Sequence, residues 1–532
     1  MRSPKLSAHK SHGAALRAFV CLVVAALVST LGLAAATPAQ AASYTLTASG
    51  AGTTTTSVAK KLTVTYKHNG KKVAKATAQL QYWNGKKWVK EKNVTIKNGT
   101  GSVSVKHAVM DRKYRFYIKG KATSKSFVVH FIPANFTISG SGAGHGVGMP
   151  QYGAYELSRE GRSAASILTT YYPGTTPSRA NNPSGKIRVQ VLGAPADTRT
   201  TTTLTLDRGG FTLLDGAGKQ LYATTASGSV AIGVNGASVT AKATAGGATT
   251  ALPATSRLVM KWDNAQGTVS VAGAHGTYRY GTLEITSIQK RPNVVNVSVL
   301  NTEYLEGVDE MPASWANAGG KQALVAQVIA ARTYAILAVS KDKEAGSAAR
   351  KAACDCNVYD DTRSQNFTGW KKAGPAANKP WVDAVKSTVH TDPNYVDGSS
   401  VDVLRDAQKG FAETPFFAST AKVKNVRTGS NADVFGTKSL PYLKGVADPY
   451  SVKAPSNPYL SWSKKLTQAQ AKKLFGSDVK KIAVSAKYSG GLVKTITVTT
   501  ATGSTKKITK TANAWQTALG VESPWITAIA GK

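Results

Sequence analysis

The sequence predicts an α+β fold in which a large β-rich domain is built around a central helix and follows a small all-β sandwich. Residues 44–132 alternate apolar and polar side chains in short runs separated by turns, which is typical of half-buried strands. Residues 186–300 are rich in Thr, Val and Gly and show no helical period. Between residues 303 and 335 the apolar residues recur at the spacing of one face of a helix. The apolar residues of that face are Leu324, Val328, Ala331 and Ala335.

Residues 1–41 have the layout of a signal peptide. Basic residues precede an apolar run from Ala18 to Ala36, and Ala39-Gln40-Ala41 fits a small-residue cleavage site. An uncleaved anchor helix is the alternative. No other segment reads as apolar enough to span a membrane. We therefore expect a secreted protein, extracellular or cell-wall-associated, that meets the membrane only through its signal peptide during export.

The chain is strongly basic, with 67 Lys and Arg against 28 Asp and Glu and a formal charge of +39. An exported chain without a recognisable nucleic-acid motif seldom meets nucleic acid, so we expect no such partner. Residues 60–125 alone hold 18 basic residues against Glu91 and Asp111. We expect anionic wall polymers and peptide carboxylates as partners, and a solvated surface that serves solubility is the alternative.

Residues 44–132 read as strands divided by turn pairs such as Asn84-Gly85, at the spacing of a small β-sandwich. The pattern Leu80-x-Tyr82-x-x-Gly85-x-x-Trp88 resembles Ig-like modules of secreted bacterial proteins. This resemblance implies a binding or spacer domain without chemistry. Trp83 and Trp88 form either a sugar-stacking platform or part of a packed core.

Beyond the signal peptide, the chain contains only two cysteines, Cys354 and Cys356. A Cys-x-Cys pair alone is a weak metal signal, because a structural zinc site usually needs four ligands. A local disulfide or two free thiols are the simpler interpretations. We expect no metal and no cofactor.

One acid, Glu310, stands just ahead of Met311-Pro312 and the central helix. The helix carries polar residues in an Ala/Val-rich setting, with Gln327 and Tyr334 on one face and Arg332 as a fixed charge that could orient a carboxylate or a sugar. The alternative is that Arg332 pairs with a structural acid and Glu310 is a first-turn acid at a helix N-terminus.

Two long strings resemble the SpoIID/LytB (stage II sporulation protein D) domain, a family that includes lytic transglycosylases of peptidoglycan and amidase enhancers. The first runs through Glu310-Met311-Pro312 to Ala330-Ala331-Arg332-Thr333-Tyr334-Ala335. The second, Gly144-His145-Gly146-Val147-Gly148-Met149-Pro150-Gln151-Tyr152-Gly153-Ala154, resembles the family signature GHGVGMSQYGA. The resemblance covers residues 136–530, with residues 186–300 as a β-rich insert.

The order of these strings departs from the sporulation proteins, where the signature lies near the C-terminus. A permuted arrangement brings both to one cleft if the domain ends lie close together. It predicts a contact between His145 and the Glu310 region. A third string, Asp361-Thr362-x-x-Gln365, resembles a family loop, and Gln365 either bonds a sugar or satisfies backbone groups.

The resemblance implies Glu310 as the catalytic residue and a set of glycan-positioning side chains. A lytic transglycosylase needs one carboxylate, and burial beside Met311, Pro312 and Trp315 would raise the pKa of Glu310. A non-catalytic amidase enhancer that binds the wall beside a cell-wall amidase is the first alternative, and a basic structural wall protein is the second. The substrate-binding candidates are His145, Gln151, Gln327, Arg332, Tyr334 and Gln365, and the expected partner is the peptidoglycan glycan strand.

Overall fold

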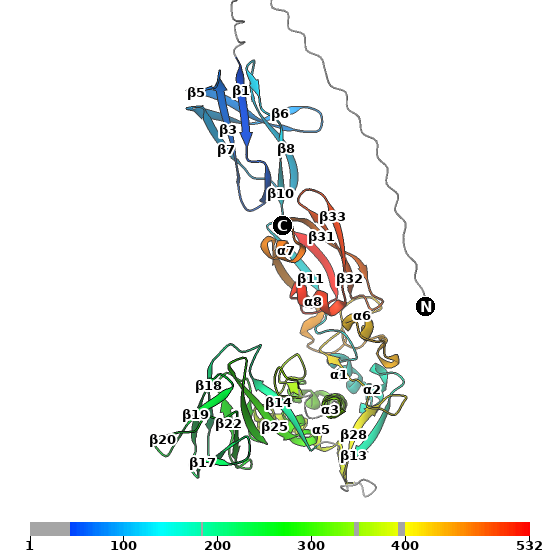
Figure 1. The fold of residues 1–532 in the computed structure, drawn as a ribbon. Helices are drawn as coiled ribbons and strands as arrows, with labels where there is room; N and C mark the ends of the chain where they lie inside the picture. The colour runs from blue at the N-terminus through cyan, green and yellow to red at the C-terminus, as the bar shows by residue number, and fades with distance from the viewer. Residues whose placement is uncertain (1–42, 182–184, 345–350, 392–398) are drawn as a thin grey trace, which may run out of the picture.

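The computed structural model describes residues 43–181, 185–344, 351–391 and 399–532, with side chains of the central helix described to residue 340. The expected signal peptide lies outside these residues. The fold is β-rich α+β, as predicted. Within the described residues, buried side chains form three large hydrophobic clusters, one in each of three bodies that follow one another in Figure 1, and a small cluster around Cys354 and Cys356.

The N-terminal body is all β. Its strands join in the order β1-β3-β7-β6-β5-β8-β10-β2, and β2 pairs in parallel with β10. Alternation places Leu62, Leu80 and Phe116 in its core, each fully buried. The strands are β1 (Tyr44–Ser49), β2 (Gly52–Thr55), β3 (Lys60–His68), β4 (Lys71–Lys72), β5 (Lys75–Trp83), β6 (Trp88–Lys97), β7 (Thr100–Val105), β8 (Met110–Ile118), β9 (Ala122–Thr123) and β10 (Phe127–Ile132).

The β-rich stretch expected between residues 186 and 300 forms two sheets. One has the order β17-β16-β21-β24-β25-β14-β26 and the other β20-β19-β18-β15-β22-β23. The strands are β14 (Lys186–Leu192), β15 (Thr201–Leu206), β16 (Phe211–Asp215), β17 (Gln220–Thr224), β18 (Gly228–Asn235), β19 (Ser238–Ala245), β20 (Ala248–Ala251), β21 (Arg257–Trp262), β22 (Val269–Val271), β23 (Thr277–Tyr278), β24 (Thr282–Ile288), β25 (Arg291–Val299) and β26 (Val358–Tyr359).

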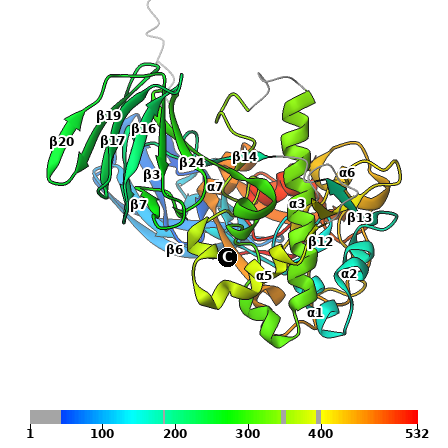
Figure 2. The ribbon, with the colours of Figure 1, turned by 90° about the horizontal axis from the view of Figure 1, so that it is seen from below.

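The predicted central helix is α3 (Lys321–Glu344), which packs against α1, α2, α5 and β28 (Figure 2). Lys321–Ser340 is long and apolar enough to cross a membrane, contrary to our expectation for segments beyond the signal peptide, but it is 72% buried, as in a core helix. The remaining elements of this body are β12 (Met149–Pro150), α1 (Gln151–Arg159), α2 (Ala164–Tyr171), β13 (Thr176–Asn181), η1 (Leu300–Tyr304), η2 (Ala313–Ala318), α4 (Trp370–Ala373), η3 (Ala376–Asn378), α5 (Lys379–Lys386), β27 (Val389–Thr391), β28 (Ser399–Arg405), β29 (Phe416–Phe417), α6 (Asn431–Phe435), η4 (Pro441–Leu443) and η5 (Pro458–Leu460).

The third body is formed by two segments of the chain, one that precedes the central body in sequence and one that follows it. Its strand β11 pairs with both β30 and β34, and the Ala134 N–H donates to the Lys532 carbonyl at 2.7 Å. The two ends of the segment 136–530 therefore lie side by side, as the permuted order of motifs required. The elements are β11 (Asn135–Gly140), β30 (Trp462–Thr467), α7 (Gln468–Phe475), β31 (Val479–Lys487), β32 (Val493–Thr500), β33 (Thr505–Thr509), α8 (Ala512–Leu519) and β34 (Ile526–Gly531).

Candidate functional site around Glu310

Glu310 lies on a loop that is tied to a second segment by backbone and side-chain bonds. The π-helical turn η1 leads into this loop, and Val308 forms a β-bridge with Phe367. The Asp309 N–H donates to the Asn366 carbonyl at 2.7 Å, and the Asn366 amide donates to the Asp309 carbonyl at 2.8 Å. The backbone N–H of Asn366 then donates to Glu310 Oε1 at 2.7 Å. The carboxylate is therefore held at a defined place.

The signature motif reaches this loop through Gln151, the first residue of α1. Its Nε2 donates to the Glu310 carbonyl at 3.0 Å and to Glu310 Oε2 at 3.4 Å, across 159 residues of sequence. Gln151 is itself buried. The sequence predicted that His145 would contact the Glu310 region. Among the described residues, Gln151, six residues further on, makes that contact, and His145 lines a different cavity.

A buried ammonium holds the other side of the loop. Lys372, on α4, is only 3% exposed. Its Nζ donates to Asp309 Oδ1 at 2.8 Å and to the Met311 carbonyl at 2.8 Å. Asp309 is thereby engaged in an ion pair, and both neighbours of Glu310 in sequence are fixed by one side chain.

Glu310 lines a cavity of about 510 Å³. Of the described residues around it, the acids are Asp309 and Glu310 alone. Tyr152 and Trp315 meet edge to face at 4.9 Å, and Tyr152 and Tyr459 do so at 5.9 Å. Aromatic faces beside one acid suit a ligand that has both flat apolar faces and hydroxyls, such as a sugar.

Burial raises the pKa of Glu310 above its ordinary value, as expected from the sequence. The hydrogen bonds from Asn366 and Gln151 favour the charged form and oppose this effect, while nearby Asp309 adds to it. The net result is a carboxyl group that keeps its proton to higher pH than a free glutamate. Such a group is better suited than a free glutamate to act as a general acid.

Three other candidates are enclosed in the protein core. Gln327, Arg332 and Gln365 have no exposed surface. Gln365 accepts from the Tyr304 hydroxyl at 2.6 Å and donates to the Ala331 carbonyl at 3.3 Å. Arg332 donates to the Asp402 carbonyl at 3.1 Å, and burial lowers its pKa to about 10. None of the three lines the Glu310 cavity.

His145 and Tyr334 lie together in a different cavity, of about 700 Å³, which shares no lining residue with the first. The Nδ1 of His145 accepts from the Val147 N–H at 3.0 Å, and the ring also bonds the backbone of Phe416. Burial lowers the pKa of His145 to about 4, so the ring is neutral at pH 7. Tyr334 bonds the side chain of Ser364. The two residues are brought together, but away from Glu310.

The comparisons with known proteins support the motifs that lie within residues 289–392. Residues 289–392, which include Glu310, match the family model described as Stage II sporulation protein (SpoIID). This segment is therefore similar to a SpoIID domain. The amidase enhancer of Bacillus subtilis (strain 168) is 40% identical over 86 residues, which cover 15% of this chain and 12% of that relative. The chain thus spans a small part of the curated relative it matches.

Solved structures give weaker similarity. The Yersinia pseudotuberculosis adhesin InvE is 10% identical, with 46% of this chain and 58% of that chain covered and a TM-score of 0.13. The BSP domain of a biofilm-associated protein is 9% identical, with 48% and 66% covered and a TM-score of 0.09. Neither TM-score indicates a common fold with this chain.

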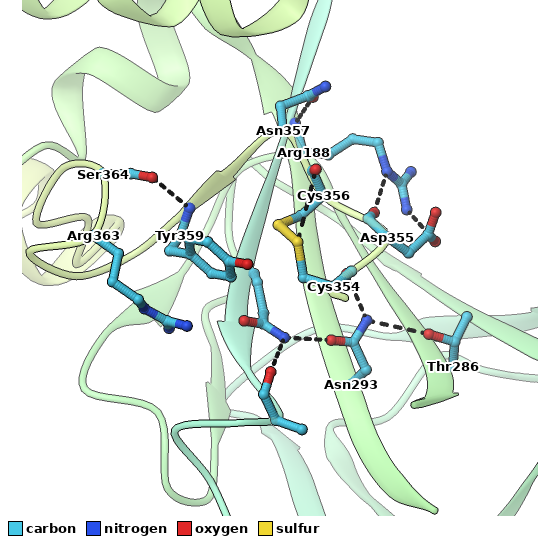
Figure 3. The surroundings of a disulfide bond; sticks show 12 residues. Arg188, Thr286, Asn293, Cys354, Asp355, Cys356, Asn357, Tyr359, Arg363 and Ser364 are labelled. Carbon is cyan, nitrogen blue, oxygen red and sulfur yellow. Dashed lines mark hydrogen bonds and ion pairs between the residues drawn. A yellow bond between two sulfur atoms is a disulfide. The ribbon is translucent and has the colours of Figure 1, made fainter. Parts of the chain in front are cut away.

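The matched segment contains a disulfide between Cys354 and Cys356, with an Sγ–Sγ distance of 2.11 Å (Figure 3). Of the two possibilities open from the sequence, the disulfide is therefore the one observed. Asn293 on β25 donates to the Cys354 carbonyl at 2.9 Å, and Arg188 on β14 donates to the Asp355 carbonyl at 2.9 Å. These bonds fasten the segment that leads to Asn366 onto the edge of the sheet. Among the described residues, no group of three His, Cys, Asp or Glu side chains could hold a metal ion.

Several side chains of the Glu310 site were not identified from the sequence. Asn366 follows Gln365 in a motif that drew attention to the glutamine, although the backbone of Asn366 makes the bond to Glu310. Lys372 stands in a basic stretch with no apolar pattern to suggest burial. Tyr459 comes from a segment 149 residues beyond Glu310, so only tertiary structure places it at the cavity.

Proposed function

We propose that this protein is a secreted peptidoglycan lytic transglycosylase that cleaves the MurNAc-GlcNAc glycan strand, with Glu310 as general acid and base. The observation that carries the proposal is a carboxyl group with a raised pKa, fixed in a cavity with aromatic walls, on a segment similar to a SpoIID domain. A hydrolase would need a second free carboxylate. The neighbouring acid, Asp309, is paired with Lys372.

The chemistry needs one acid that acts twice. Protonated Glu310 donates its proton to the glycosidic oxygen as the bond from that oxygen to C1 of the muramoyl sugar breaks. The C6 hydroxyl of the same sugar then attacks C1, and its proton passes to the Glu310 carboxylate. The products are a 1,6-anhydromuramoyl end and a free hydroxyl on the leaving sugar, and Glu310 is protonated again without consuming water.

The surrounding side chains would prepare Glu310 for these steps. Gln151 and the Asn366 N–H hold the two carboxylate oxygens and would stabilise the charged form between proton transfers. Tyr152 and Trp315 would pack against sugar rings. We no longer favour Gln327, Arg332 and Gln365 as substrate contacts, since their side chains are enclosed.

The test compares Glu310→Gln with the matched variant Glu303→Gln. Both replace a carboxylate with an amide on the same segment, but Glu303 caps the Val299 N–H and does not line the cavity. The mature protein, residues 42–532, is incubated with purified peptidoglycan and the soluble products are analysed by mass spectrometry. We expect anhydro-ended products from wild type and Glu303→Gln only. Equal release by Glu310→Gln would remove Glu310 as the acid.

A second candidate function is supported by the similarity to a protein named amidase enhancer. In this alternative the protein binds the wall and stimulates a separate cell-wall amidase without cleaving glycan. Wild-type protein would then release no anhydro ends alone, but would increase peptide release when a purified cell-wall amidase is added. Glu310→Gln would stimulate as well as wild type.

A further inference from the structure

The solvent face of the N-terminal body carries an ordered group of aromatic and arginine side chains. Strands β5, β6 and β8 are adjacent, with Trp83 paired to Trp88 and Gln81 paired to Arg115. Leu80 and Phe116 point into the core, so these residues project from the opposite face. The sequence left open whether the two tryptophans belong to the core. Trp83 is 41% exposed, which places it at the surface.

Contacts among these side chains hold them in place without a ligand. The rings of Trp83 and Trp88 lie 5.6 Å apart at 60°, and the Arg115 guanidinium lies 4.4 Å from the Trp88 ring centre. Arg115 Nε donates to Gln81 Oε1 at 2.9 Å. Arg115 is half-buried, and among the described residues its terminal nitrogens make no hydrogen bond. We define the Trp83 platform as Trp83, Trp88, Arg115 and Gln81.

The N-terminal body that carries the platform has a large excess of positive charge. Residues 60–125 carry 18 basic residues against two acids. Glu91 is bound by His107 and Arg112, and Asp111 by His130 and Lys480. Both acids are therefore engaged elsewhere. A ligand for this face should carry negative charge as well as flat apolar faces.

We propose that the Trp83 platform binds peptidoglycan strands, with a sugar ring packed on Trp83 and a peptide-stem carboxylate paired with Arg115. The planar guanidinium fork matches a carboxylate, and a tryptophan face matches the apolar face of a pyranose. Exposed aromatic patches on soluble proteins commonly mark binding sites. The platform is separate from the Glu310 cavity, and this proposal does not require Glu310 to be catalytic.

The experiment measures co-sedimentation of residues 42–532 with peptidoglycan stripped of covalently attached phosphate polymers. Trp83→Ala should weaken binding by about 3- to 10-fold, the range expected for one lost aromatic stack. Trp83→Phe should retain most of the affinity because it keeps a ring. Val58→Ala is the control, since Val58 is a 56% exposed apolar residue of the same body outside the platform.

Two readouts separate this proposal from the function of Glu310. Release of anhydro ends from short soluble glycans should be unchanged in Trp83→Ala, and circular dichroism should show an intact fold because the side chain is exposed. Unchanged binding by Trp83→Ala would overturn the proposal. Binding that requires the attached phosphate polymers would also overturn it, because the ligand would then be the polymer and not the strand.

Discussion

Replacing Gln365 by leucine should destabilise the central body by about 2–3 kcal/mol. Leucine is close to glutamine in size but has no polar atoms, so two buried groups lose their partner. The Tyr304 hydroxyl, which is fully buried, loses an acceptor at 2.6 Å. The Ala331 carbonyl loses a longer bond at 3.3 Å. An unpaired buried hydroxyl costs about 1–3 kcal/mol, and the longer bond adds less.

Differential scanning calorimetry of residues 42–532 would measure this effect. One transition should move down by about 4–10 °C in Gln365→Leu. A double-mutant cycle with Tyr304→Phe isolates the pair. The double variant should lose less unfolding free energy than the two single variants lose together, because removing both partners leaves no unpaired hydroxyl.

The opposite pattern would refute this reasoning. If Gln365→Leu kept its stability but lost affinity for peptidoglycan, Gln365 would contact glycan, which is the role suggested by the family resemblance. Additive losses with Tyr304→Phe would show that the two side chains do not act as a pair. The alternative left open from the sequence was a glutamine that satisfies backbone groups, which describes the bond to the Ala331 carbonyl. The bond from the Tyr304 hydroxyl, which the structure adds, is the reason to expect a coupled loss.

Four further outcomes follow from the structure. The rate of glycan cleavage should fall as pH rises through the raised pKa of Glu310, as measured by kcat/KM between pH 4 and 9. Because the pKa of Glu310 is higher in the folded than in the unfolded protein, its protonated form stabilises the fold at low pH, and this stabilisation is lost as the pH rises through the folded-state pKa. The Glu310→Gln variant stays neutral, so it should be more stable than wild type at neutral pH and equally stable at pH 3. Lys372→Met should lower kcat by on the order of 10-fold or more, with less effect on KM, because the ammonium that fixes Asp309 beside the acid is gone. A protein comprising residues 42–532 should show no free thiols in a thiol-titration assay, native or unfolded, until a reductant opens the bond between Cys354 and Cys356.

The periodic parts of the fold could be predicted from the sequence. The run 187–192 alternates and is strand β14, and the apolar spacing from Leu324 to Ala335 falls inside α3. The alternation and the helical spacing of the apolar residues were sufficient to predict the type of each element. Burial itself extends beyond one face, since every residue of β14 after Lys186 is buried and so is most of α3. The boundaries of the three bodies are harder to predict from the sequence, because β11 pairs with two strands from the far end of the chain.

The polar residues of α3 show why the site could be predicted only in part. A polar residue in an Ala/Val-rich helix gives the same sequence pattern whether its side chain contacts a ligand or a buried carbonyl. Arg332 bonds the backbone carbonyls of Asp402 and Asn301 in the core, whereas the alternative drawn from the sequence was a pair with a structural acid. Gln151 and Glu310 were identified from motifs, but their hydrogen bonds depend on a tertiary contact that no local pattern encodes.

Three segments from different parts of the chain contact the Glu310 loop, and this arrangement is compatible with the permuted order of the motifs. The loop is held by Gln151 from before the β-rich sheets, by Asn366 from after α3, and by Lys372 from α4. Each contact requires only that its segment enters the central body in the same place. The Ala134 N–H donates to the Lys532 carbonyl, so the two ends of the segment lie together. A different order of the same segments, with the chain joined at this point and opened at another, would leave the three contacts unchanged. The environment that raises the pKa of Glu310 is thus a property of the assembled core and not of the order in which the chain visits it.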